Sequence, residues 1–146
     1  MPDYSKAKIY KIYSYENDDV YYGSTCETLS QRMTRHRSYL KSYKEGKGKY
    51  ITSIQILEFE SAKIELVENY PCNSKEELLQ REGYYIRNNN CVNKYIPDRT
   101  KKEYNKAYRE ANNEKYTEYQ KIYMREKRAL KKEQLLMLNE DTNINK

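Results

Sequence analysis

The sequence contains no tryptophan, only one phenylalanine, and no apolar run that approaches the length of a membrane-spanning helix. Such a helix needs about 20 consecutive apolar residues, so we expect no membrane partner. The N-terminus also lacks the apolar stretch of a secretory signal peptide. These absences predict an intracellular protein, in the cytoplasm or the nucleus of a host cell.

Cysteine is scarce as well. Cys26, Cys72 and Cys91 are odd in number and show no paired spacing, which is typical of a reducing compartment. With the single histidine, His36, they could make a zinc set, but no CxxC pair supports this alternative. We interpret the three cysteines as packing residues.

Tyrosine and charge dominate what is present. The 18 tyrosines can bury their rings and still offer a hydroxyl, and 34% of residues are charged, so we expect one small domain with an appendage. Residues 1–98 contain 15 Lys and Arg against 14 Asp and Glu, whereas residues 99–146 contain 13 against 8. The basic excess in the second segment indicates contact with nucleic-acid phosphates or, equally, a solvated charged helix.

The sequence KIYKIYS, a polar turn and then VYYGS predict a β-hairpin near the N-terminus. An amphipathic helix is expected over 28–45, residues 50–59 fit a short helix or a strand, and residues 62–70 predict a strand. The order β-β-α-(α)-β-α predicts a small α+β domain with a largely antiparallel sheet.

A capping box at Ser74 and Glu77 opens a second helix that ends near Asn88, and residues 91–97 are expected to be extended. Within this helix Glu82 lies about 40° from Leu78 and therefore inside the apolar stripe. A buried carboxylate costs several kcal/mol unless it is paired. Glu82 is thus either the partner of a core-facing arginine or a metal ligand or catalytic acid.

Arg32 and His36 are one turn apart at the edge of the apolar face of the first helix, whereas Arg35 and Arg37 point elsewhere, as surface charge does. A single histidine beside an apolar stripe is more often a structural residue than a catalytic one. The arginine that points inward beside it favours the catalytic interpretation. In the hairpin, one register places Tyr10 and Tyr21 on the same face and the other separates them.

Two tyrosines, an arginine, a histidine and one carboxylate suit the hydrolysis of a phosphodiester. Glu82 would hold a single Mg²⁺ (or Mn²⁺), which prefers oxygen ligands and keeps several waters, and Arg32 would neutralise the phosphate. Tyr10 would act as the base if the metal or Arg32 lowers its pKa, and His36 would then take the proton. A single inward carboxylate argues against a two-metal nuclease.

Five features follow one another along the chain: KIYKI, YYGST with Tyr21 eleven residues after Tyr10, Arg32 with His36, REGYYI, and CVNKY. In this order they resemble the GIY-YIG nuclease family over about residues 6–97. The sequence departs from the family at Lys8, where the first motif has glycine, and at Tyr22, where the second has isoleucine. The resemblance implies a three-stranded antiparallel sheet flanked by helices, with one active site, and a metal-dependent DNA endonuclease.

By the same resemblance, each site residue has an expected role. Tyr10 would be the general base, Tyr21 would support water or phosphate, and Arg32 would stabilise the transition state. His36 would assist proton transfer, Glu82 would bind the metal, and Asn93 would support the site. Gly23 is expected as a second supporting residue. Independently of the family, Gly23 would let a phosphate or another chain approach the strand closely.

After residue 98 there is no glycine or proline, which predicts one long helix over 100–138 with a frayed end over 139–146. EYNKAYRE and EYQKIYMRE recur in it with a period of 15 residues. We expect residues 1–98 to form the nuclease domain and 99–146 a basic, tyrosine-rich tail.

The residues expected to contact DNA are basic residues of the first helix and of the tail: Arg35, Arg37, Lys41, Lys101, Lys102, Arg109, Arg125 and Arg128. No RING-type cysteine cluster or helix-hairpin-helix signature is present, so we expect a homing-type endonuclease of a virus or mobile element. The alternatives are a DNA-binding protein without catalysis and a helical interaction protein that retains the fold.

Overall fold

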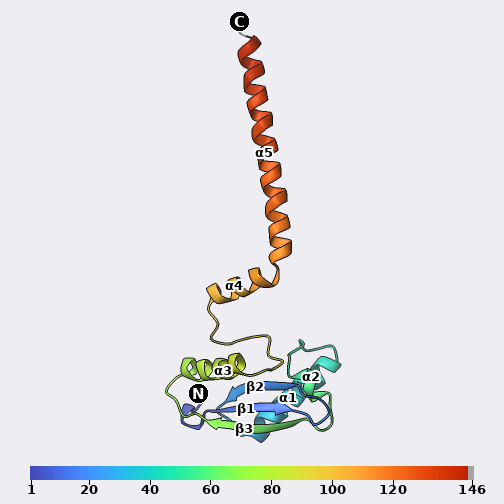
Figure 1. The fold of residues 1–146 in the computed structure, drawn as a ribbon. Helices are drawn as coiled ribbons and strands as arrows, with labels where there is room; N and C mark the ends of the chain where they lie inside the picture. Colours follow the sequence, from blue (N-terminus) through green and yellow to red (C-terminus); the bar gives the residue numbers. More distant parts are fainter. Residues whose placement is uncertain (145–146) are drawn as a thin grey trace. The chain divides into compact units, whose positions relative to one another are not determined.

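The structure is a computed structural model that describes residues 1–144. It divides the chain into two compact units, of which the first comprises Met1–Arg99 and the second begins at Thr100 (Figure 1). Each unit has its own secondary structure.

The first unit is built on a three-stranded antiparallel sheet. The strands are β1 (Lys8–Tyr13), β2 (Val20–Thr25) and β3 (Lys63–Asn69), in the spatial order β2-β1-β3 with β1 in the centre (Figure 1). A short 3-10 turn, η1 (Tyr4–Lys6), precedes β1. The expected α+β fold and its N-terminal hairpin are therefore confirmed.

The hairpin register decides the question that the sequence left open. Tyr10 lies opposite Gly23 and Ile12 lies opposite Tyr21. Directly opposed residues of an antiparallel pair point to the same face of the sheet, and side chains alternate along each strand. Tyr10 and Tyr21 consequently share one face, while Ile9 and Ser24 point to the other.

The face with the two tyrosines is covered by α1 (Leu29–Lys44) and α2 (Ile54–Leu57). Thr28 caps α1 in a reciprocal capping box with Gln31, which fixes the start of the helix that carries Arg32 and His36. Segment 50–59 is thus partly a short helix rather than a strand. The buried core on this face consists of Tyr10, Ile12, Met33, Ile56, Leu57 and Ala62.

The opposite face packs against α3 (Lys75–Asn88), whose Leu78 is buried with Ala7 and Ile9. Ser74 caps this helix as expected, but the carboxylate of Glu77 accepts from the backbone N–H of Asn73, one residue before the cap. Segment 91–97 forms no strand, although the N–H of Val92 donates to the carbonyl of Val20 at 2.8 Å.

Over its described residues, 100–144, the second unit contains the helices α4 (Lys101–Ala111) and α5 (Asn113–Ile144). The single helix expected over 100–138 is therefore wrong in two respects. It is interrupted at Asn112, whose side-chain amide donates to the carbonyl of Tyr108, and asparagine competes in this way with the helical backbone. The helix also continues through 139–144 instead of fraying, and 145–146 lie outside the described residues.

The tyrosine repeat of the second unit places two pairs of rings one turn apart. Tyr104 stacks with Tyr108 in α4, and Tyr119 stacks with Tyr123 in α5, each with ring centroids 6.4 Å apart.

Within residues 1–144, no helix combines the length and the apolarity that crossing a membrane requires.

Candidate active site

The candidate site is centred on a hydrogen bond between β1 and α1. The hydroxyl of Tyr10 lies 2.8 Å from Nε2 of His36, and both side chains are essentially inaccessible to solvent. Their rings meet edge to face with centroids 5.8 Å apart. The inward placement of His36 on α1, which the sequence indicated, brings it directly to the first tyrosine.

Both ring nitrogens of His36 are engaged in hydrogen bonds. Nδ1 lies 3.0 Å from the hydroxyl of Ser53, just before α2. Burial, reinforced by the charge of Arg32, lowers the pKa of His36 to about 3, so the ring is neutral at neutral pH. A neutral ring has one donor and one acceptor. Because the Tyr10 oxygen already accepts from Nε–H of Arg32, the phenol O–H is left to donate to Nε2, and Nδ1–H then donates to Ser53.

Arg32 makes the second contact with the phenol. Its Nε–H donates to the Tyr10 oxygen at 2.8 Å, and its guanidinium carbon lies 5.8 Å from the centroid of the ring. We expected this arginine to lower the pKa of Tyr10. It does so, but burial outweighs it, and the pKa of Tyr10 is raised above its ordinary value. In the free protein Tyr10 is therefore a protonated phenol.

Tyr21 lies on the neighbouring strand, against the same histidine. Its ring meets His36 edge to face with centroids 5.6 Å apart, and it is half-buried, whereas Tyr10 is fully buried. Burial, followed by the negative charge of Glu82, raises the pKa of Tyr21 to about 12. Tyr21 is thus a neutral hydrogen-bonding group that solvent reaches.

Glu82 approaches β2 from the other face of the sheet. Its Oε2 accepts a hydrogen bond of 2.5 Å from the hydroxyl of Ser24. Burial raises the pKa of this carboxyl, while the hydrogen bond from Ser24 and the charge of Arg32 partly offset the rise. The sequence allowed Glu82 to be the partner of a core-facing arginine. The structure does not show this ion pair, because the side-chain hydrogen bond of Glu82 is with Ser24.

The two residues expected to support the site are Gly23, within β2, and Asn93, beside that strand. A β-carbon added to Gly23 would overlap the phenol of Tyr10, so the space beside this glycine is filled by the tyrosine ring and not left for a phosphate or another chain. Asn93 binds the outer edge of β2: its Oδ1 accepts from the N–H of Tyr22 at 2.9 Å, and its Nδ2 donates to the carbonyl of Tyr22 at 2.8 Å.

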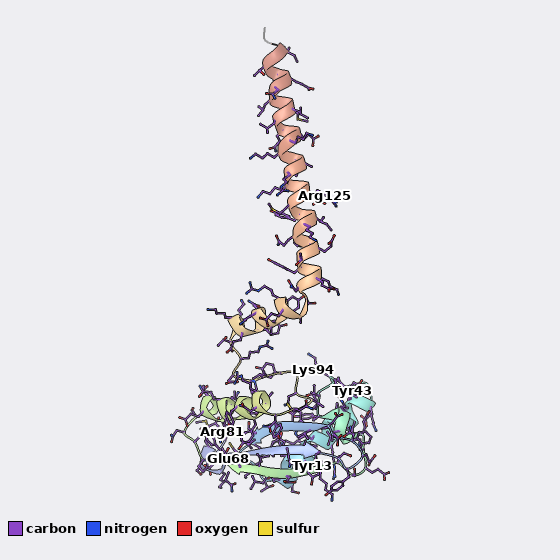
Figure 2. All side chains as sticks on the ribbon, viewed as in Figure 1. Tyr13, Tyr43, Glu68, Arg81, Lys94 and Arg125 are labelled. Carbon is purple, nitrogen blue, oxygen red and sulfur yellow. The ribbon has the colours of Figure 1, made fainter. Side chains whose placement is uncertain are left out.

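The sequence did not indicate the ion pair that fixes α3. Arg81 donates to both oxygens of Glu68 on β3, at 2.7 and 3.1 Å, and the hydroxyl of Tyr85 donates to Glu68 at 3.0 Å. Figure 2 shows Arg81 and Glu68 close together, and the guanidinium also lies 4.7 Å from the ring centroid of Tyr84. Because Arg81 directly precedes Glu82, this clamp sets the rotation of the helix that presents the carboxylate.

Ser24 and Ser53 were also missed, because a serine next to a site has no distinctive sequence pattern. For Ser24 one signal was available: it alternates with Gly23, so it had to face α3 whenever Tyr21 faced α1. Ser53 precedes a four-residue helix that the sequence left ambiguous, and nothing in the sequence connects it with His36.

The structure thus brings Tyr10, Tyr21, Arg32 and His36 together and places Glu82 against Ser24 on the other face of β2. The residues expected to bind DNA are not part of this cluster. Arg35, Arg37 and Lys41 are exposed on α1, where Arg35 pairs with Glu27. The other expected contacts are exposed residues of the second unit: Lys101, Lys102, Arg109, Arg125 and Arg128.

Zinc does not fit the residues that the sequence raised as an alternative. Both ring nitrogens of His36 are engaged in hydrogen bonds, and the three cysteines are free thiols. Among residues 1–144 no cluster of three or more His, Cys, Asp or Glu side chains is arranged to hold a metal ion.

Comparison with known proteins supports the family assignment. The family model of the GIY-YIG catalytic domain matches residues 6–96. A solved structure entitled "Structure of the Catalytic Domain of Homing Endonuclease I-TevI" shares 22% identity with a TM-score of 0.47, covering 62% of this chain and 99% of that chain. A second solved structure, a point mutant of the catalytic domain of intron endonuclease I-TevI, shares 23% identity with a TM-score of 0.46, covering 65% of this chain and 97% of that chain. No curated protein matches the chain. The family model spans well over half of the sequence, and the chain therefore belongs to the GIY-YIG family of nucleases.

Proposed function

We propose that the protein is a metal-dependent DNA endonuclease that hydrolyses phosphodiester bonds, of the homing type found in viruses and mobile elements. The observation that carries the proposal is the hydrogen-bonded set of buried Tyr10 and His36 with half-buried Arg32, together with Glu82, which is bonded to Ser24 of the neighbouring strand. The match to the GIY-YIG catalytic domain supports a nuclease, and the basic excess of residues 99–146 supports DNA as its substrate.

In this proposal Tyr10 and His36 act as a proton relay. The raised pKa of Tyr10 means that a free phenolate is not the base. Instead, the phenol oxygen takes a proton from the attacking water while its own proton passes to Nε2 of His36. Burial and the charge of Arg32 lower the pKa of His36 and make this ring a weak base in the free protein, so the transfer requires the bound phosphate to draw Arg32 away and to stabilise the imidazolium with its negative charge. Ser53 holds the ring in the required tautomer through Nδ1. The relay needs no charged tyrosine at any stage.

Arg32 connects this relay to the phosphate. In the free protein its Nε–H occupies a lone pair of Tyr10. A bound phosphate draws the guanidinium toward its oxygens, because a charge-assisted contact is stronger than one to a neutral phenol. The lone pair then becomes available to water, and the same arginine neutralises the charge that builds up on the phosphate. Tyr21, half-buried beside His36, orients the water or the phosphate.

The chemistry of Glu82 fits one divalent cation, Mg²⁺ or Mn²⁺. It is a half-buried carboxylate whose raised pKa reflects an environment that disfavours its uncompensated charge. Ser24 engages one oxygen and orients the carboxylate. When bound, the cation would supply charge stabilisation for the leaving oxygen.

The second unit would supply DNA affinity. Its exposed Lys and Arg side chains suit contacts with phosphates, which position a protein on DNA without reading sequence. The stacked pairs Tyr104–Tyr108 and Tyr119–Tyr123 are exposed and offer aromatic edges beside these charges. Catalysis by residues 1–98 and binding by 99–146 is the division that we propose.

The proposal is tested by incubating the purified full chain with supercoiled plasmid and Mg²⁺. We expect nicked or linear products that disappear when the metal is chelated and return when Mg²⁺ or Mn²⁺ is added back. Binding to the plasmid without cleavage, across metals and substrates, would mean that the fold serves as a DNA-binding platform. Absence of both cleavage and binding would favour a helical interaction protein.

A further inference from the structure

A cleft of about 640 Å³ opens beside the candidate active site, entirely within the first unit. Two of its lining residues belong to the site itself: Arg32, which donates to Tyr10, and Ser24, which donates to Glu82. The cleft is therefore continuous with the place where the scissile phosphate would lie. Its size is in the range of small-molecule sites and is sufficient for a nucleotide.

One part of the cleft is cationic. Arg32 and Arg35 project from α1, and Lys75 stands at the start of α3, so the positive groups come from two elements on opposite faces of the sheet. Two acidic residues also line the cleft, and both are engaged: Glu27 pairs with Arg35, and Asp3 pairs with Lys6 at 3.3 Å. Arg32 and Lys75 are left as the positive charges that face an incoming anion.

The other part of the cleft is apolar. Pro2, Tyr4, Leu78 and Leu79 form it, contributed by the N-terminal segment and by α3. Phosphates alone would gain nothing from such a wall, whereas a nucleobase is a flat, largely apolar group that packs on leucine and tyrosine side chains. A cationic side and an apolar side within one cleft match the two ends of a nucleotide.

We propose that this cleft binds one nucleotide of the cleaved strand, adjacent to the scissile phosphate, with its base unstacked. This inference rests on the proposed function, since it takes the strand to pass Arg32. The neighbouring phosphate contacts Lys75 and the terminal guanidinium nitrogens of Arg32, and the base lies against Leu79 and Tyr4. Unstacking a base costs a few kcal/mol and costs least where the strand is already single or mismatched. The cleft therefore favours cleavage at frayed, bulged or mismatched positions.

The test uses the full chain with methyl-labelled leucine and thymidine 3′,5′-bisphosphate, a single nucleotide with a phosphate on each side. Thymidine and inorganic phosphate are titrated in parallel. We expect the bisphosphate to shift the methyl signals of Leu78 and Leu79 and to bind at least about tenfold more tightly than either fragment. Lys75→Gln should weaken the bisphosphate about tenfold, and Leu79→Gln should weaken it while leaving inorganic phosphate unchanged. Lys44→Gln, an exposed lysine of α1 outside the cleft, is the matched control.

Three results would overturn the inference: no shift at the cleft leucines, equal binding of inorganic phosphate and bisphosphate, or equal effects of Lys75→Gln and Lys44→Gln. Plasmid cleavage by the same preparation separates this failure from failure of the proposed function. Cleavage without binding in the cleft refutes the nucleotide site and leaves the endonuclease intact. Binding in the cleft without cleavage refutes the endonuclease and leaves a nucleotide-binding site.

Discussion

The hydroxyl of Tyr10 and Nε2 of His36 lie 2.8 Å apart in a part of the molecule that solvent does not reach. Tyr10 comes from the central strand and His36 from the helix that covers it, so this hydrogen bond also joins two elements of the core. The pair to which we assign the proton relay therefore also holds the core together. Substitutions at this pair must be assessed for stability as well as for activity.

The buried histidine makes stability depend on pH. Burial lowers the pKa of His36 to about 3, so between this value and about 6.5 the unfolded chain binds a proton that the folded chain does not. Its contribution to the free energy of unfolding is complete above pH ~6.5 and is lost as the pH falls toward 3, by up to ~1.4 kcal/mol per unit.

His36 is the only histidine, so an NMR titration of its ring assigns the ionisation without ambiguity. We expect no protonation of the folded protein near neutral pH and weaker resistance to urea at about pH 5 than at about pH 7. A ring that titrates near 6.5 in the folded protein would contradict the burial of His36 as a neutral group.

Gly23→Ala tests the packing between the hairpin and the site. The new methyl group would overlap the phenol of Tyr10 and force the ring away from Arg32 and His36. We expect a loss of ~1–3 kcal/mol in stability and a fall in cleavage of more than about tenfold.

Gly46→Ala is the control for this substitution. Gly46 has φ 72° and nothing within 4 Å of the added methyl, so the change costs ~1–2 kcal/mol through the backbone alone. Its cleavage rate should be unchanged under conditions where both variants are folded. Equal activity of the two variants would show that Tyr10 tolerates displacement.

The clamp between Glu68 and Arg81 should influence Glu82 without touching the substrate. Glu68→Gln weakens a partly buried bidentate pair, and we expect a loss of ~1 kcal/mol in stability. Cleavage at saturating DNA should fall several-fold and a higher Mg²⁺ concentration should partly restore it, because the helix that presents Glu82 is less firmly held. Glu65→Gln is the matched control, because Glu65 is also a β3 glutamate in an ion pair, but it is more exposed than Glu68 and pairs with Lys11 of β1 rather than with α3. Identical Mg²⁺ dependence of both variants would refute the positioning role.

Much of the first unit follows from local patterns. The hairpin, α1 and α3 begin and end close to where turns, caps and apolar spacing place them, and the inward direction of His36 and Glu82 follows from helical periodicity. These features depend on residues close in sequence. The family match over 6–96 agrees with a resemblance that rests on single residues scattered over about ninety positions.

Relations between distant segments were not predictable. The register that unites Tyr10 and Tyr21 depends on how two strands pair, and the partner of Glu82 turned out to be Ser24, 58 residues away. We expected a lowered pKa for Tyr10 because the sequence indicates the nearby charge of Arg32. The sequence does not show how deeply the phenol is buried, and burial raises its pKa. In the second unit, the helix breaks at Asn112, where one side-chain hydrogen bond engages the carbonyl of Tyr108. The surrounding sequence favours helix throughout, so this single contact could not be foreseen.

The second unit should contribute electrostatic affinity. Arg125 and Arg128 are exposed on α5, and the double substitution Arg125→Gln/Arg128→Gln should reduce the slope of log affinity against log salt by about 1.8 if each contacts a phosphate. The measurement is a salt titration of binding to duplex DNA by the full chain. An unchanged slope and affinity would exclude these residues from the DNA interface.

The central claim is tested most directly by comparing Glu82→Gln with Glu76→Gln, an exposed glutamate of the same helix, for plasmid cleavage in Mg²⁺. Burial raises the pKa of Glu82, so its charge opposes folding at neutral pH, and Glu82→Gln should be at least as stable as the wild type. We predict that it binds plasmid normally and cleaves it at least about a hundredfold more slowly, while Glu76→Gln behaves as the wild type. Wild-type cleavage by folded Glu82→Gln would contradict the account.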